Sequence, residues 1–90
     1  MDYVKSYGEI LKDLGYRKVH TGTRMLEYAA EYMAAQSPAV SMTKHVYPAV
    51  ERAFEVENAE RSMRYAARKA GDSRTVAQIL WDLVDEGVPD

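Results

Sequence analysis

The chain has no cysteine among its 90 residues, so it can form neither a disulfide framework nor a thiolate metal site. Its only histidines, His20 and His45, do not have a metal-binding spacing, and a metal site is not expected. No apolar stretch approaches the length of a membrane span, and the N-terminal residues lack a signal-peptide pattern. We therefore expect a cytoplasmic protein without a metal, a cofactor or a membrane anchor.

Catalytic motifs are also missing. The sequence contains no glycine-rich phosphate loop, and no nucleophile is paired with a base. We therefore expect no enzymatic activity and no small-molecule substrate. The composition is 47% hydrophobic and 29% charged, with the charges spread among the apolar residues, which indicates one ordered domain over residues 1–90.

Apolar residues recur with helical spacing in five segments that are separated by glycine, proline or polar turns. Pro48 is awkward inside the third segment, so the regular helix either begins near Pro48 or is bent in its first turn. In the last segment Ile79 and Leu80 are expected to be buried. No segment alternates with period two, and the predicted fold class is all-α, a compact bundle of about five helices. These span about Tyr3 to Leu14, Thr23 to Gln36, Thr43 to Phe54, Asn58 to Ala70 and Arg74 to Glu86.

The fourth segment, which the Asn58 side chain is expected to cap, carries an arginine stripe. Arg61, Arg64 and Arg68 lie at i, i+3 and i+7, within a wedge of roughly 60° on a helix, and Tyr65 lies beside them. The opposite side is small and apolar, as in a helix that packs on a core. It consists of Ala59, Met63, Ala66, Ala67 and Ala70. This arrangement suits a helix that presents arginine to an anion, although an ordinary solvated face has the same pattern.

Charge is distributed unevenly. The net charge is −2, which argues mildly against a free-standing nucleic-acid binder. The segment from Arg61 to Arg74, however, contains five basic residues and a single acid, Asp72, while most acids lie elsewhere. Two consecutive helices with a short connector, the second of them cationic, fit a helix-turn-helix over about residues 43–70, with a recognition helix over about 58–70.

Two sequence motifs narrow the interpretation. Thr43-Lys44-His-Val-Tyr-Pro48, followed by Glu60-Arg-Ser-Met-Arg-Tyr-Ala66, resembles the C-terminal DNA-binding effector domain of the sporulation-initiation response regulator family. That family carries Thr-Lys-x-x-Tyr-Pro before its helix-turn-helix and Glu-Arg-Ala-Ile-Arg-His-Ala in its recognition helix. The resemblance covers about residues 7–70 and implies a stand-alone, shortened version of that domain.

The resemblance also implies roles for individual residues. Glu60, Arg61 and Arg64 fall where the family's recognition helix meets DNA, and Tyr65 replaces its histidine. Arg68 would add base or phosphate contacts, Lys44 a backbone phosphate contact, and Glu60 would accept from a cytosine amino group or orient Arg61. The expected partner is double-stranded DNA. Two alternatives remain for the oligomeric state, self-association on tandem sites and a monomer in free solution.

A second hypothesis is a degenerate protein-interaction module that pairs with a regulator or with itself and no longer binds DNA. Three features support it: an acidic isoelectric point, a connector two residues shorter than the family's, and Asn58 where the family has arginine. Trp81 lies beside the apolar stripe of the last helix, where it would either cover a core edge or mark a partner surface.

Overall fold

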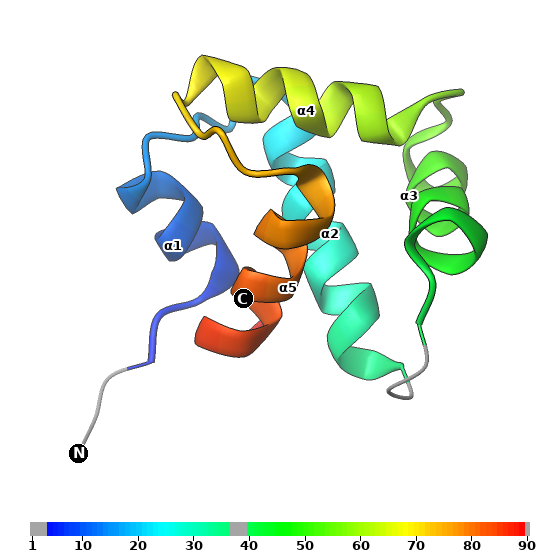
Figure 1. Cartoon of the computed structure of the whole chain (residues 1–90), viewed down its shortest axis with the longest axis horizontal. Helices are drawn as coiled ribbons and strands as arrows, with labels where there is room; N and C mark the ends of the chain where they lie inside the picture. The colour runs from blue at the N-terminus through cyan, green and yellow to red at the C-terminus, as the bar shows by residue number, and fades with distance from the viewer. Residues whose placement is uncertain (1–3, 37–39, 90) are drawn as a thin grey trace.

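The helix α2 (Thr21–Ala35) lies at the centre of the fold, and the other elements pack around it. The computed structural model describes residues 4–36 and 40–89. Besides α2, these form α1 (Tyr7–Asp13), the π-helical turn η1 (Met42–Val46), α3 (Tyr47–Phe54), α4 (Ala59–Lys69) and α5 (Val76–Glu86). Figure 1 shows α4 across the top of α2, with α3 on one side and α1 on the other. The all-α fold class is confirmed.

The core draws on every helix. Met25, Leu26 and Ala29 of α2 are fully buried and pack with side chains from the surrounding elements. Ile79 and Leu80 of α5 are also fully buried, as predicted from their spacing. Further fully buried apolar side chains include Tyr7, Leu11, Val46, Val50 and Met63. Within the described residues no helix is both long and apolar enough to cross a bilayer.

The starts of α1, α2 and α5 differ from the predictions, and side-chain caps set the starts of α1 and α5 but not that of α2. α1 begins at Tyr7 instead of Tyr3, which lies outside the described residues, because Ser6 and Glu9 form a capping box. α5 begins at Val76 instead of Arg74, since the Thr75 hydroxyl accepts a hydrogen bond from the Gln78 N–H at 3.1 Å. α2 begins at Thr21, two residues earlier than predicted, with His20 as N-cap.

Pro48 lies at the junction between two kinds of helix. Ser41 caps η1, and the N–H groups of Val46 and Tyr47 reach back five residues, to the carbonyls of Ser41 and Met42. The α-helical pattern starts at Tyr47, which places Pro48 in the first turn of α3, where no N–H donor is needed. Of the two predicted alternatives, the regular helix beginning near Pro48 is the one observed.

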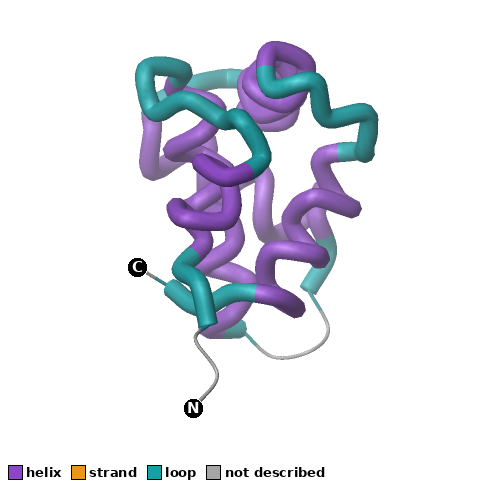
Figure 2. The backbone as a smooth tube through the Cα atoms, turned by 90° about the vertical axis from the view of Figure 1, so that its left-hand side faces the viewer, coloured by secondary structure: helices purple, strands orange, loops and turns teal. Residues whose placement is uncertain are grey.

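A very close approach joins α2 and α4. A Cβ atom added at Gly22 would overlap the Ser62 carbonyl oxygen and would lie 2.9 Å from the Ala66 Cβ. Only glycine lets the start of α2 touch the α4 backbone at this point. Figure 2, turned by 90°, shows α4 nearly end-on above the other helices.

The two ends of the described chain pair with each other. The Tyr7 N–H donates to the Val88 carbonyl at 2.9 Å, and the Val88 N–H donates to the Lys5 carbonyl at 3.1 Å. This isolated bridge closes the bundle below α4 (Figure 2). These paired segments, residues 5–7 and 88, therefore lie away from the outer side of α4 (Figure 2).

Replacing Gly22 by alanine tests the α2–α4 contact. A glycine-to-alanine change inside a helix ordinarily stabilises by about 0.5–1 kcal/mol. Here the added methyl group must displace the α4 backbone, so we expect Gly22→Ala to lower the free energy of unfolding by about 1–3 kcal/mol. Urea denaturation measures the difference. The adjacent exposed change Thr21→Ala should stay within about 0.5 kcal/mol, and a stabilised Gly22→Ala variant would contradict the observed packing.

Candidate nucleic-acid interface

Helix α4 has two chemically distinct sides. Ala59, Met63, Ala66 and Ala67 are buried against the core, as predicted, while Ala70 is half-buried at the C-cap. On the other side the predicted side chains are exposed, together with Lys69. We call this outer set the α4 cationic face: Arg61, Arg64, Tyr65, Arg68 and Lys69. The small apolar side lets the helix lie close to α2, so the long cationic side chains point away from the core.

The connector before α4 is ordered by Glu51 and Asn58. The Asn58 Oδ1 accepts from the Arg61 N–H at 3.0 Å, which confirms the predicted cap. A second cap was missed: Glu51 Oε2 accepts from the Ala59 N–H at 3.1 Å and so links α3 to α4. Glu55 adopts a left-handed conformation, with φ 55°, and so turns the chain without glycine. Together these residues fix where α4 begins relative to α3.

Three contacts organise the cationic face. Glu60 pairs with Arg64 at 3.4 Å. One of the two roles predicted for Glu60 was to orient Arg61, and this pairing is not observed. The Lys69 ammonium lies 5.5 Å from the centre of the Tyr65 ring, which meets the His20 ring edge-on at 5.7 Å between centroids. Among the described residues Arg61 and Arg68 have no ion-pair partner. The face therefore keeps at least two unpaired guanidinium groups.

A groove of about 450 Å³ runs beside this face. One wall comes from the turn that leads into α2, and the other wall from α4. The lining residues are Val19, His20, Thr21, Gly22, Arg61, Ser62 and Tyr65. The Gly22 contact brings these two segments together, and nothing in the sequence motifs indicated that they would be neighbours.

Lys44 lies on a different element from the other predicted site residues. It is exposed in η1, and its backbone N–H donates to the Ser41 hydroxyl at 3.3 Å. η1 packs against α2 and α3. The structure thus places Glu60, Arg61, Arg64, Tyr65 and Arg68 on one helix with Asn58 at its cap, and it positions Lys44 separately.

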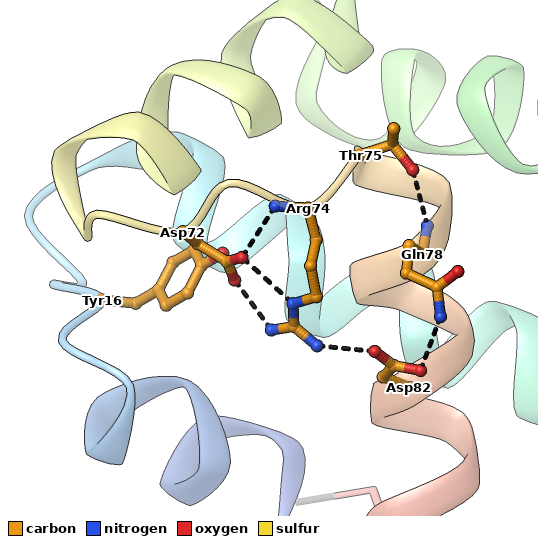
Figure 3. A network of polar contacts seen from close by, with 6 residues as sticks. All are labelled: Tyr16, Asp72, Arg74, Thr75, Gln78 and Asp82. Carbon is orange, nitrogen blue, oxygen red and sulfur yellow. Dashed lines mark hydrogen bonds and ion pairs between the residues drawn. The ribbon is translucent and has the colours of Figure 1, made fainter.

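Arg74 does not belong to the cationic face, although the sequence grouped it with the basic segment. Its guanidinium group donates to Asp72 through Nε (3.0 Å) and Nη2 (2.7 Å), and to Asp82 through Nη1 (2.7 Å). The Tyr16 hydroxyl donates to Asp72 at 2.7 Å. Figure 3 shows this network joining the loop after α4 to α5 and to the loop after α1. Both acids therefore neutralise Arg74 within the fold.

The network changes the acidity of its members. The hydrogen bonds from Arg74, opposed by burial and assisted by Tyr16, lower the pKa of Asp72 from 3.8 to about 2. Burial, followed by the hydrogen bond to Asp72, raises the pKa of Tyr16. Asp72 favours folding above the pKa of the unfolded chain, and this contribution is lost as pH falls from about 4 to about 2. Tyr16 favours folding below about pH 10, and its contribution is lost at higher pH.

Aromatic side chains are divided between the core and the surface. Tyr7 and Tyr16 are buried, whereas Tyr28 meets Phe54 edge-on at the junction of α2 with α3. Trp81 is 43% exposed on the outer side of α5, so it does not fill the core. Among the described residues no group of three potential metal ligands occurs.

Comparisons with protein-family models, with curated proteins and with solved structures gave no match to this chain. The resemblance to the sporulation regulator's effector domain therefore stays a prediction. The geometry of the cationic face is the remaining guide to function.

Because of this network, the free energy of unfolding should fall as the solution becomes acidic. Between about pH 4 and pH 2 the free energy of unfolding of the wild type should lose about 1–2 kcal/mol through Asp72, because the carboxylate must be protonated. Asp72→Asn should be less stable at pH 6 and should lack this part of the decline. Asp85→Asn also removes one negative charge, but at an exposed residue outside the network. This variant should keep the loss of stability between pH 4 and pH 2. Urea titrations at several pH values measure all three, and equal slopes for wild type and Asp72→Asn would contradict the prediction.

Proposed function

We propose that this protein binds double-stranded DNA, with α3 and α4 as a helix-turn-helix and α4 as the recognition helix. The observation that carries the proposal is the cationic face: exposed arginines on a helix whose opposite side is anchored in the core. Arginine reads guanine through O6 and N7 in the major groove and also neutralises phosphates. The proposal extends to a bacterial, cytoplasmic transcription regulator of the sporulation-regulator effector type.

Residues at different positions along α4 are expected to contact different parts of the DNA. Arg61 and Arg64 lie nearer the N-terminal end, the part of a recognition helix that usually contacts base edges. Arg68 lies farther along, where phosphate contact is more common, and Lys44 would supply another phosphate contact from η1. Glu60 lies beside Arg64 at 3.4 Å and could hold that guanidinium in a fixed direction for bidentate contact.

The second candidate is a protein-interaction module, and the exposed Trp81 on α5 favours it. An exposed tryptophan is typical of partner surfaces. The two candidates use different helices, since DNA binding depends on α4 and partner binding on α5. Variants on the two helices therefore separate them.

The test is a fluorescence titration against random-sequence duplex at about 50 and 200 mM salt. Each lost phosphate contact should flatten the slope of log affinity against log salt by about 0.9, so Arg68→Gln and Lys44→Gln should each show that change. Arg61→Gln and Arg64→Gln should cost about 1–3 kcal/mol on a cognate site and less on random duplex. Trp81→Ala should leave DNA binding unchanged. Wild-type protein that binds no duplex at about 50 mM salt and tens of micromolar protein would end the DNA proposal.

A further inference from the structure

The turn that leads into α2 is rich in positive charge. Residues 17–24 include Arg17, Lys18 and Arg24 and contain no acid. All three side chains are exposed. No sequence motif assigned them a role, because they lie about forty residues from the predicted recognition helix.

Folding places this turn against α4. Val19, His20 and Thr21 line the same groove as Arg61 and Tyr65, and the His20 ring meets the Tyr65 ring at 5.7 Å. The overlap that any Cβ at Gly22 would make with the Ser62 carbonyl shows that the two backbones are in direct contact. The position of the turn relative to α4 is therefore set by packing of main chain on main chain.

The cations of the turn are only weakly engaged by the protein. The Lys18 ammonium lies 3.7 Å from Glu27 Oε1, and its side chain remains 68% exposed. Arg24 Nη2 donates to the Thr21 hydroxyl at 3.3 Å, which holds the guanidinium over the first turn of α2. Arg17 has no ion-pair partner among the described residues. These groups are available to an external anion.

DNA geometry indicates what that anion is. The major groove is about 12 Å wide, and a helix with its side chains is about 10–12 Å across, so a helix seated there fills the groove between two phosphate backbones. A segment fixed along the flank of such a helix lies on the side where one of those backbones passes. Phosphate contacts of this kind set the register of a protein on the duplex.

We propose that the turn before α2 is a second DNA-contacting element, in which Arg17, Lys18 and Arg24 hold the phosphate backbone alongside α4. This inference rests on the proposed DNA binding by α4. It makes the interface a composite of two segments that are distant in sequence and are locked together at Gly22. It would also supply local positive charge for duplex binding in a chain whose net charge is −2.

The test compares Arg17→Gln/Arg24→Gln with wild type in the same salt titration on random duplex. Two lost phosphate contacts should flatten the slope by about 1.8, twice the change of about 0.9 for one contact. Lys5→Gln is the control, because it removes one positive charge outside the proposed interface. Lys5 pairs with Asp13, and its backbone carbonyl accepts from the Val88 N–H. Its slope should equal that of the wild type. Circular dichroism of each variant checks that the fold is kept.

The outcomes separate this inference from the proposed function. If Arg68→Gln flattens the slope and Arg17→Gln/Arg24→Gln does not, DNA binding by α4 stands and the second element is overturned. If Lys5→Gln flattens the slope by about half as much as the double variant, the change per removed charge is the same at both places; the effect is then one of overall charge, and the inference is again overturned. Wild-type protein that binds no duplex overturns both.

Discussion

The close contact between Gly22 and the Ser62 carbonyl fixes how α2 packs against α4 and where the turn before α2 lies. It sets the distance between α2 and α4, and small side chains on α4, Ala59, Ala66 and Ala67, continue the approach along that helix. Because the inner side of α4 packs against α2 and the core, its long charged side chains lie on the outer side. The same contact brings the turn before α2 beside the cationic face. One glycine thus determines both how α4 is anchored and what surrounds its exposed side.

Local features could be predicted from the sequence, whereas features that join distant segments could not. The five helices, the buried pair Ile79 and Leu80, and the Asn58 cap follow from periodicity and from residue preferences within a few positions. The hydrogen bond from Tyr16 to Asp72 spans 56 positions, and no periodic pattern encodes it. Arg74 was therefore counted with the surface cations although two aspartates neutralise it. The Ser6–Glu9 capping box was readable, since a serine followed three residues later by glutamate is a known start signal.

The electrostatic organisation gives the two groups of basic residues different roles. Arg74 stabilises the fold by joining Asp72 on the loop after α4 to Asp82 on α5. Arg61 and Arg68 contribute no such link, and Arg64 has only a neighbouring glutamate on its own helix. Exposed pairs of that kind add little stability. The cost of keeping several like charges close together on α4 is more readily understood if an anionic partner binds there, and this is the reason why the DNA proposal is preferred over an ordinary solvated face.

Amide chemical-shift mapping can locate the surface that binds DNA. A ¹⁵N-labelled sample titrated with a short random duplex at low salt reports each backbone position separately. If DNA binds the proposed interface, fast-exchange shifts should be concentrated on residues 17–24 and 59–69, with little change on α5. Shifts centred on Trp81 and its neighbours, with α4 unaffected, would rule out this interface and would favour the protein-interaction module.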